Sequence, residues 1–422
     1  MQIDLQSLNG ACACKKVHTL YTREVVIARG AISMVPEMLS RYGYRLPLVV
    51  CDANTYAVAG EAVCAQTNAK AVVLQGEHLH ADEHAVNELT SRLPNGVDVL
   101  LAVGAGTIHD VVRYTAFSRG IPFISVPTAA SVDGFVSTVA AMTWRGLKKS
   151  FASAAPVAVA ADTDILMRAP YRLTASGVSD LMGKYTAIAD WRIAHLVTGE
   201  YICERICTMA LDAVAAAEAS LMDLRKGEAD AYERLMYGLL LSGLAMQMVG
   251  NSRPASGAEH HLSHLWEMEA ITPALDALHG EKVCVGLMLL LPVYESIGCA
   301  IREGRCGVIP YEGLELCLLE PAFPEREKLR GILEENAPDP LETVDLPTIK
   351  SALPAIEQVL GTLPKHEFLN QELHLGGCKQ TLEEIGLHSS VRELSLSIAP
   401  YVRNRLTLLR LSKLLCLTPG TK

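Results

Sequence analysis

The second half of the chain carries acidic and histidine side chains at spacings that suit a divalent metal ion. Asp180 and Lys184 are four residues apart, and His260 and His264 have the same spacing further along the chain. Residues four apart share one face of a helix. His279 follows in a predicted loop that opens another helix. One carboxylate and two imidazoles leave a coordination position open, as a catalytic zinc ion requires, and nickel or iron(II) would accept the same donors.

Each of these segments also has an ordinary structural interpretation. Two histidines on one helix face can belong to a solvated surface, and Asp180 can be a helix cap. A metal site requires that ligands from separate segments converge. We expect convergence here because the carboxylate and the imidazoles occur in one chain with a further motif, a glycine-rich turn.

The glycine-rich turn follows an apolar run that predicts a strand over Val97–Val103. It comprises Gly104, Gly106 and Thr107 around an alanine, and a helix is predicted over residues 108–118. Backbone N–H groups in such a turn can approach phosphates, and the N-terminus of a helix favours anions. A full dinucleotide fingerprint has a third glycine where this chain has His109. The sequence therefore predicts either a variant phosphate cradle or a plain strand-to-helix turn.

Two aspartates follow predicted strands. Asp52 comes directly after Leu46–Cys51, where an acidic residue commonly receives the adenosine ribose hydroxyls. The same position also suits a helix N-cap, and both interpretations stay open. Asp133 lies in a loop of small and hydroxylated residues over 126–134. An unpaired buried carboxylate is costly, so we expect Asp133 to have a hydroxyl or a cation as its partner.

The elements that position these residues differ between the two halves of the chain. The first half contains short runs that are apolar throughout, as expected of parallel strands covered on both faces. Crossover helices are predicted between them, over 54–67 and 81–93, which indicates a doubly wound α/β fold. The predicted strands are Leu46–Cys51, Ala71–Leu74, Val97–Val103, Pro122–Val126 and Val157–Ala161.

After Pro170 the strand pattern ends and long helical patterns follow. We therefore predict two domains, an α/β dinucleotide-binding domain over residues 1–168 and an all-helical metal- and substrate-binding domain over residues 169–422. The predicted helices of the second domain include Glu204–Lys226, Ala229–Met248, Val283–Gly298 and Val391–Leu415.

Composition excludes several classes of function. The formal charge of −10 argues against a nucleic-acid partner, which requires a basic footprint. The first ten residues have no apolar core of a secretory signal. The longest uncharged stretch, between Arg234 and Arg253, is diluted by polar residues, so we expect a buried helix and not a membrane span.

The chain has twelve cysteines, mostly within apolar runs, which is typical of reduced thiols in a cytoplasmic protein. Cys12, Cys14 and His18 form the only suggestive group. Two thiolates and an imidazole can hold zinc, but a fourth ligand and the usual two-residue spacing are missing. We therefore predict an N-terminal strand or turn here.

Five segments together are similar to the NAD(P)-dependent sn-glycerol-1-phosphate dehydrogenases, within the wider superfamily of metal-dependent alcohol dehydrogenases and dehydroquinate synthases. The resemblance runs from about the first strand to the terminal helix, and it implies a Rossmann-like parallel-sheet domain followed by an all-helical domain of the dehydroquinate synthase-like type. The segments are GAGTIHD, PFISVPTAASVDGF, SGVSDLMGKYTAIADW, SRPASGAEHHLSHLWEME and LHGEKVCVG.

The resemblance implies roles for residues in these segments. Asp180, His260 and His279 would hold the metal, with Asp180 also close to the substrate. Asp133 would contact the substrate, and His264 would bind the substrate or support the ligands without being a ligand. The implied cofactor contacts are Gly104, Gly106, Thr107, Asp110, Thr128, Ser131 and Ser137.

The sequence departs from the family pattern at three positions. Ala105 stands where many relatives have serine or glycine, Ala130 where many have proline, and Ser179 where glycine is common. None of these changes removes a ligand. They bear on cofactor preference and affinity and leave the implied chemistry unchanged.

The implied reaction is reversible reduction of dihydroxyacetone phosphate to sn-glycerol 1-phosphate by NAD(P)H, with Zn²⁺ or Ni²⁺ polarising the carbonyl. His264 or water would relay the proton. Lys184 and Arg253 are the nearest cations by sequence and one of them would receive the substrate phosphate. Asp52 favours NAD, because a carboxylate repels the 2′-phosphate of NADP.

The sequence is also compatible with other functions. A glycerol or other small-polyol dehydrogenase of the same superfamily would not require phosphate contacts. A dehydroquinate synthase-like lyase would be expected to have glutamate in place of Asp180. A non-catalytic protein that senses the cofactor is a further alternative. The expected partner is a small phosphorylated polyol or ketone, without nucleic acid or membrane insertion, and the expected assembly is a homo-oligomer, a dimer or larger.

Overall fold

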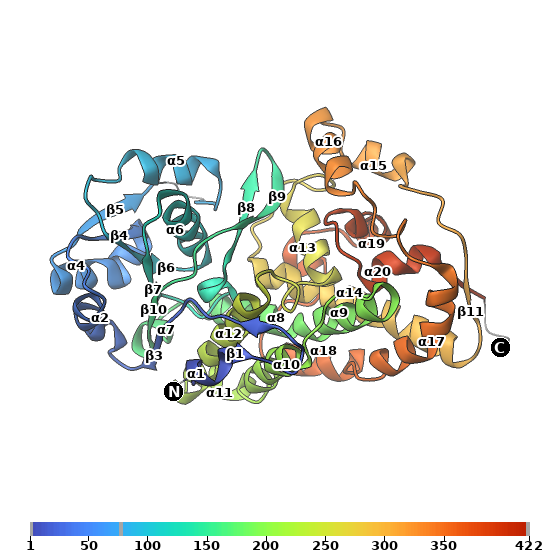
Figure 1. Cartoon of the computed structure of the whole chain (residues 1–422), viewed down its shortest axis with the longest axis horizontal. Helices are drawn as coiled ribbons and strands as arrows, with labels where there is room; N and C mark the ends of the chain where they lie inside the picture. The colour runs from blue at the N-terminus through green and yellow to red at the C-terminus, as the bar shows by residue number, and fades with distance from the viewer. Residues whose placement is uncertain (1–2, 76–78, 419–422) are drawn as a thin grey trace. The chain divides into compact units, whose positions relative to one another are not determined.

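The computed structural model describes residues 3–75 and 79–418 (Figure 1). Its contacts divide the chain into two compact units, unit 1 with Met1–Leu181 and Thr208–Ser252 and unit 2 with Met182–Cys207 and Arg253–Lys422. This division does not follow the single boundary that we predicted between residues 168 and 169. Helix α12 (Ala229–Val249), predicted in the second domain, is part of unit 1 because it packs on the segment around Val136.

A six-stranded sheet forms the centre of unit 1, and every pair of neighbouring strands in it is parallel. Five strands confirm the sequence prediction to within two residues. The sequence analysis did not include the edge strand β3, although its residues 25–28 are apolar like those of the predicted strands. In spatial order the strands are β3 (Glu24–Ala28), β10 (Ala158–Asp162), β7 (Phe123–Pro127), β6 (Val99–Gly104), β4 (Pro47–Asp52) and β5 (Lys70–Leu74).

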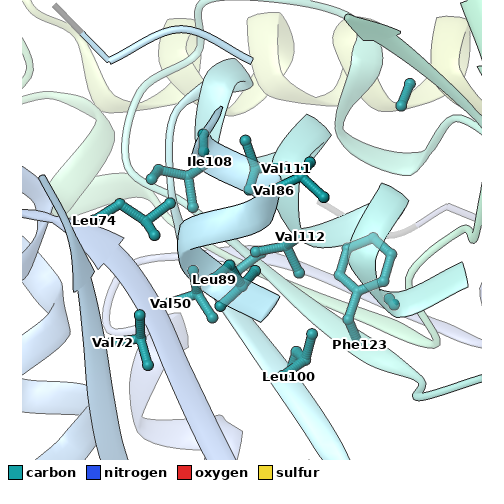
Figure 2. Close-up of a cluster of buried hydrophobic side chains, with 14 of the residues drawn as sticks. Val50, Val72, Leu74, Val86, Leu89, Leu100, Ile108, Val111, Val112 and Phe123 are labelled. Atoms are coloured by element: carbon teal, nitrogen blue, oxygen red, sulfur yellow. The ribbon is translucent and has the colours of Figure 1, made fainter. Parts of the chain in front are cut away.

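Helices cover both faces of this sheet, because successive side chains of a strand point to opposite faces. Val50 belongs to the core beneath α5 (Glu83–Ser91) and α6 (Gly106–Arg119), where Figure 2 shows it with Leu89, Val112 and Phe123 among others. The neighbouring Val49 belongs to the opposite core, beneath α2 (Val35–Tyr42) and α4 (Glu61–Thr67). The predicted doubly wound α/β fold is confirmed.

The chain reverses its direction across the sheet between β4 and β6. From β4 it continues to β5 at one edge, whereas from β6 it continues to β7 and then β10 on the other side. Ligands of open α/β sheets bind beyond the carboxyl ends of the strands at such a reversal. Asp52 and Gly104 are the last residues of these two strands.

Unit 1 also contains an antiparallel hairpin that the sequence analysis missed, β8 (Val139–Trp144) with β9 (Leu147–Ala152). Its two connecting residues, Arg145 and Gly146, both have positive φ angles, 51° and 72°. Such a two-residue turn suits the twist of a hairpin. The Arg145-Gly146 pair was the feature of the sequence that could have indicated this hairpin.

Unit 2 consists mainly of helices, among which α13 (Ala258–Glu267) packs against α14 (His279–Arg302). Helix α14 is long and apolar enough to cross a membrane by length and composition, but 61% of its apolar window is buried inside the protein. Core helices have the same properties, so this is weak evidence for a membrane span. The predicted buried helix between Arg234 and Arg253 corresponds to α12, whose residues from Gly238 to Met248 are all buried.

The predicted helix over Val391–Leu415 is wrong. The segment forms α19 (Arg392–Ile398), short 3-10 turns and α20 (Leu408–Leu411), and its end enters a two-stranded sheet of β11 (Cys306–Val308) and β12 (Leu415–Leu417). Apolar spacing suggested one helix, but Pro400 lies within a 3-10 turn. Its ring cannot continue a regular helix.

The predicted helix over Glu204–Lys226 is also interrupted, because α10 ends at Glu218 and α11 begins at Leu221. The remaining helices are α1 (Leu5–Leu8), α3 (Ala53–Thr55), α7 (Thr163–Leu166), α8 (Tyr171–Met182), α9 (Lys184–Thr198), α15 (Leu316–Ala322), α16 (Arg326–Glu335), α17 (Leu346–Leu360) and α18 (His366–Leu375).

Candidate functional site

The glycine-rich turn connects β6 to α6 and leaves no room for side chains. A Cβ atom on Gly104 would lie 2.5 Å from Cγ1 of Ile108, and one on Gly106 would lie 3.0 Å from Cγ2 of Val132. The backbone is therefore bare at the start of α6, where N–H groups favour anions. The N–H of Thr128 donates to the carbonyl of Gly104 at 3.0 Å and joins the turn to the end of β7.

Asp52 lies beside this turn. The register pairs Val50 with Ala102, and two residues further along the two strands are Asp52 and Gly104. The Asp52 carboxylate accepts from the N–H of Thr55 at 2.8 Å, and the Thr55 hydroxyl accepts in turn from the N–H of Asp52. The helix-cap interpretation is confirmed, and the ribose contact stays a prediction.

His109 occupies the position of the missing third glycine and holds the turn in place. Its Nδ1 lies 3.0 Å from the Ala105 carbonyl and its Nε2 lies 2.7 Å from the Ser125 hydroxyl on β7. Burial, with a smaller contribution from the charge of Arg113, lowers the pKa of His109 to about 3. A neutral ring that donates through Nδ1 and accepts through Nε2 satisfies both contacts. This residue therefore clamps the turn to the sheet.

Helix α6 continues past the turn with two other predicted cofactor residues. Thr107 and Asp110 are half-buried in its first turns. An Asp110 carboxylate oxygen lies 3.6 Å from Nε of the fully buried Arg113. The assignment of Thr107 and Asp110 as cofactor contacts stays a prediction.

The loop after β7 buries the predicted substrate residue Asp133. Its carboxylate accepts from the hydroxyl of Ser242 at 2.7 Å, which confirms the expected hydroxyl partner. Its backbone N–H donates to the carboxylate of Asp180 at 3.0 Å. The structure thus brings the two predicted substrate carboxylates together within unit 1.

Helix α8, which carries Asp180, packs directly on this loop. A Cβ atom on Gly177 would lie only 2.0 Å from the Ala130 carbonyl oxygen. The hydroxyl of Ser176 donates to the Ser131 carbonyl at 3.1 Å. A residue larger than glycine at 177 would separate the helix from the loop.

The remaining hydroxyls of the loop are buried, and that of Ser137 makes a local contact. The Ser137 hydroxyl accepts from the N–H of Val139 at 2.9 Å, and the Ser137 carbonyl accepts from Arg113 at 2.9 Å. Thr128 and Ser131 are also buried. The predicted roles of Thr128, Ser131 and Ser137 toward a cofactor stay predictions.

In unit 2, three histidines of α13 and α14 converge to form what we term the histidine centre, His260, His264 and His279. The ring centroids of His260 and His279 are 5.3 Å apart, those of His264 and His279 are 5.9 Å apart, and those of His260 and His264 are 6.0 Å apart. The spacing predicted the shared face of α13, and His279 is the first residue of α14. Their roles as ligands stay predictions.

Two carboxylates that sequence reasoning assigned no role orient these rings. Nδ1 of His260 lies 2.8 Å from Glu259, and Nδ1 of His279 lies 2.8 Å from Glu267. A metal-binding histidine commonly donates its other ring N–H to a carboxylate, which directs one nitrogen toward the ion. The donor set of the histidine centre therefore fits a divalent metal.

Glu259 is fully buried and held as a carboxylate. Burial alone would raise its pKa, but hydrogen bonding from His260 and Thr186, together with the charge of His260, lowers the pKa below its usual value. The Thr186 hydroxyl and the Gly257 N–H each donate to it at 2.6 Å. The sequence could have indicated Glu259 because it directly precedes His260. Only the fold shows that its side chain faces the His260 ring.

Unit 2 also offers a second set of donors, because His264, Glu267 and His279 each have a ligand atom within 4.8 Å of the others. Glu267 additionally lies 3.3 Å from the ammonium of Lys282. Since Glu267 hydrogen-bonds Nδ1 of His279 and pairs with a cation, it suits the role of an orienting group better than that of a ligand.

His264 is a neutral imidazole. Burial, followed by the charge of Arg403, lowers the pKa of His264 well below its ordinary value. Among the described residues, Nδ1 of His264 and Nη2 of Arg403 have no hydrogen-bond partner. Arg403 was missed by sequence reasoning because it lies in the segment wrongly predicted as a continuous helix.

The two cations predicted from sequence are both buried in unit 2. Arg253 donates to Glu200 through Nε and Nη2, at 2.8 and 3.1 Å, and Nη2 also donates to the Leu406 carbonyl at 2.8 Å. These contacts give Arg253 a structural role. Lys184 is the first residue of α9 and is fully buried. Substrate binding by Arg253 or Lys184 stays a prediction.

Comparison with known proteins defines the class of this fold. A family model described as iron-containing alcohol dehydrogenase matches residues 26–170. The solved structure of a putative alcohol dehydrogenase from Ralstonia eutropha JMP134 matches with a TM-score of 0.64 and 18% identity, covering 94% of this chain and 97% of that one. The fold is therefore that of the metal-dependent alcohol dehydrogenases, as predicted.

Relatives with similar sequences show the family to which this chain belongs. The glycerol-1-phosphate dehydrogenase [NAD(P)+] of Geobacillus thermodenitrificans is 36% identical over 303 residues, which are 70% of this chain and 75% of the relative. The enzyme of the same name from Geobacillus stearothermophilus is 32% identical over 96% of both chains. The chain belongs to the glycerol-1-phosphate dehydrogenase family, which confirms the resemblance.

Proposed function

We propose that this protein catalyses the reversible NAD(P)H-dependent reduction of dihydroxyacetone phosphate to sn-glycerol 1-phosphate. The observation that carries the proposal is the pair of imidazoles, His260 and His279, each held through Nδ1 by a carboxylate. This arrangement occurs in a chain whose relatives are named glycerol-1-phosphate dehydrogenases.

We propose that His260, His279 and Asp180 hold the divalent metal, with Zn²⁺ and Ni²⁺ as the candidates. When bound, the ion polarises the substrate carbonyl as a Lewis acid. The support for Asp180 is its contact with the backbone of Asp133 and its burial. A buried carboxylate is stabilised by pairing with a cation.

The cofactor is proposed to bind at the carboxyl ends of β4 and β6. The bare backbone at Gly104 and Gly106 suits the pyrophosphate, and a bound nicotinamide supplies the hydride. Asp52 lies at the adjacent strand end and would receive the ribose hydroxyls with the carboxylate oxygen that does not cap α3. On this basis NAD is preferred over NADP.

His264 is proposed to transfer the proton to and from the substrate oxygen. Its ring is neutral and buried, and Nδ1 is available to a bound ligand in the described part of unit 2. An imidazole in that state can hydrogen-bond the substrate oxygen and exchange a proton with it as the alcohol forms.

Arg403 is proposed to bind the substrate phosphate, in addition to the earlier candidates Lys184 and Arg253. Its charge acts on His264, and Nη2 lacks a hydrogen-bond partner among the described residues. A guanidinium can donate two parallel hydrogen bonds to a phosphate. Arg253 is less suited because Glu200 already engages it.

The test is NADH and NADPH oxidation by metal-stripped protein reloaded with one ion at a time, with dihydroxyacetone phosphate as substrate. We expect turnover only with metal, and chiral analysis should identify sn-glycerol 1-phosphate. Equal turnover of unphosphorylated dihydroxyacetone would instead support a small-polyol dehydrogenase. No oxidation of either cofactor by any small carbonyl at full metal loading would support a cofactor-sensing protein.

Substitution of Arg403 tests the phosphate contact. Loss of a charge-assisted hydrogen bond costs about 1.5–3 kcal/mol, so Arg403→Gln should raise the KM for dihydroxyacetone phosphate roughly 10- to 100-fold. The KM for unphosphorylated dihydroxyacetone should not change. Arg330→Gln, at an exposed position on α16, is the matched control.

We further propose a cytoplasmic homo-oligomer that acts on a small phosphorylated substrate. The support is the family membership and the thiol state of the cysteines in the described chain. Light scattering coupled to size exclusion measures the assembly, and a monomer at working concentration would contradict that part of the proposal.

A further inference from the structure

The N-terminal segment forms a small hairpin in which β1 (Gly10–Ala11) pairs antiparallel with β2 (Val17–His18). The connecting turn is tight. The N–H of Lys15 donates to the Cys12 carbonyl at 2.9 Å, and the N–H of Cys12 donates to the Lys16 carbonyl at 3.0 Å. Lys15 has a φ of 67°, a left-handed conformation that closes the turn. This is the strand and turn that the sequence predicted.

The turn brings three potential metal ligands together. The sulfur atoms of Cys12 and Cys14 and a ring nitrogen of His18 lie within 4.8 Å of one another. Sγ of Cys14 is 3.3 Å from Nε2 of His18. In a tetrahedral zinc site with ordinary bond lengths, a sulfur and a nitrogen ligand are about 3.5 Å apart. In other zinc sites, a spacing of two residues between cysteines brings the ligands close together. Here the hairpin brings them close instead.

His18 is oriented as a ligand. Its side chain is buried, and Nδ1 lies 2.9 Å from the backbone carbonyl of Met248, near the C-terminal end of α12. When Nδ1 carries the proton and donates to that carbonyl, Nε2 presents its lone pair toward Cys14. A backbone carbonyl that fixes the tautomer in this way is a common outer partner of metal-binding histidines.

We propose that Cys12, Cys14 and His18 hold a zinc ion that is separate from the metal of the histidine centre. Two thiolates and an imidazole form a soft donor set that selects zinc. A further thiolate or a water molecule completes the four-coordinate ion. The inference does not depend on the proposed activity, because neither thiol belongs to the residues assigned to catalysis.

The ion would fasten the N-terminal segment to α12. Gln247, the residue before Met248, accepts from the N–H of Tyr21 at 2.9 Å and donates to the hydroxyl of Thr22 at 2.8 Å. The same helix carries Ser242, which hydrogen-bonds Asp133. The zinc site is therefore a stabilising clamp on the helix that supports the loop of Asp133.

Metal analysis of the whole protein tests the proposal. In a His260→Ala/His279→Ala background, which removes two ligands of the other site, we expect one tightly bound zinc per chain after dialysis. Cys14→Ser in that background should abolish it, whereas Cys317→Ser, at an exposed position on α15, should not. Absence of zinc from the double-histidine variant would overturn the proposal.

Cobalt substitution reports the ligands directly. Replacing zinc by Co²⁺ in the same background should give sulfur-to-cobalt charge-transfer absorption, which Cys12→Ser and Cys14→Ser should each weaken. Single Cys→Ser changes at the other cysteines identify any additional thiolate. A spectrum without a thiolate band, or a Cys12–Cys14 disulfide seen as a mass lower by two thiol hydrogens, would contradict the site.

A histidine variant separates metal binding from helix capping. His18→Gln can still donate to the Met248 carbonyl but lacks the imidazole nitrogen that faces Cys14. We expect loss of zinc and a lower Tm in wild-type background, with the same kcat once the histidine centre is loaded. Unchanged zinc content in His18→Gln would show that His18 only caps α12.

Discussion

The histidines described in the two units of this protein have different hydrogen-bond partners. In unit 1, His109 contacts a backbone carbonyl and a serine hydroxyl, and it is kept neutral by burial. In unit 2, His260 and His279 are each held by a glutamate. The same side chain therefore clamps a backbone turn in one unit and prepares a cation site in the other, and the partner of Nδ1 makes the difference.

The contrast extends to the ligands that each unit suits. The glycine-rich turn offers backbone N–H groups and no nearby side-chain volume, which suits phosphate oxygens. The histidine centre offers side-chain nitrogens backed by carboxylates, which suits a metal ion. Substitutions in one region should therefore leave the ligand of the other region bound.

The largest expected effect is that of His260→Ala. Loss of the ligand should remove the metal, and since Lewis-acid stabilisation supplies several kcal/mol, activity should fall by about 10³-fold or more. NADH binding measured by fluorescence and helix content measured by circular dichroism should persist. His84→Ala, at an exposed position on α5, is the control. Metal and turnover retained in His260→Ala would remove this residue from the site.

Glu259→Gln should have the next largest effect. The amide keeps the size of the side chain but loses the charge that orients His260. Changes of this kind typically lower metal affinity about 10- to 100-fold. Metal titration of the stripped protein measures it, with Glu367→Gln on the exposed face of α18 as control. Equal affinities would mean that Glu259 serves only to fill the core.

Gly106→Ala tests the other region. The new methyl group would lie 3.0 Å from Val132, and overpacking of this kind costs about 1–3 kcal/mol. Where the turn relieves that strain by moving, the Kd for NADH should rise roughly tenfold, with metal content unchanged. Gly134→Ala meets no atom within 4 Å and is the matched control. Tighter NADH binding in Gly106→Ala would contradict the cradle.

The last effect is on stability in acid and not on ligand binding. The pKa of His109 is about 3 in the folded chain against an ordinary value of 6.5, so the unfolded chain binds the proton more readily. Its contribution to stability is present above pH 6.5 and is lost as the pH falls toward 3, by at most about 1.4 kcal/mol per pH unit. His109→Gln should show a shallower dependence of unfolding free energy on pH than wild type, and His84→Gln should not.

The sequence could predict features that depend on local pattern. The central strands were found because Val99–Gly104 and its neighbours are apolar throughout, and the pairing of His260 with His264 follows from helical spacing. Convergence with His279 depends on the packing of α13 on α14. The roles of Glu267 and Arg403 depend on contacts between elements that are distant in the sequence. The periodicity of apolar residues does not predict such contacts.

One error shows the limit of hydrophobic spacing. The segment after Val391 has apolar residues at spacings that suit a single helix, but it is broken into short elements. Tertiary packing decided its conformation, since Leu408 and Leu411 are fully buried although they lie in the one-turn helix α20. Hydrophobic spacing reports burial more reliably than it reports the type of element.

The contact between Gly177 and Ala130 has a consequence for engineering. With a Cβ position only 2.0 Å from a carbonyl oxygen, a single methyl group would act as a wedge between α8 and its loop. It would pull the carboxylate of Asp180 away from the N–H of Asp133 without altering either residue. A designer could therefore weaken the contact between Asp133 and Asp180 from one helical turn away, without replacing any reactive group.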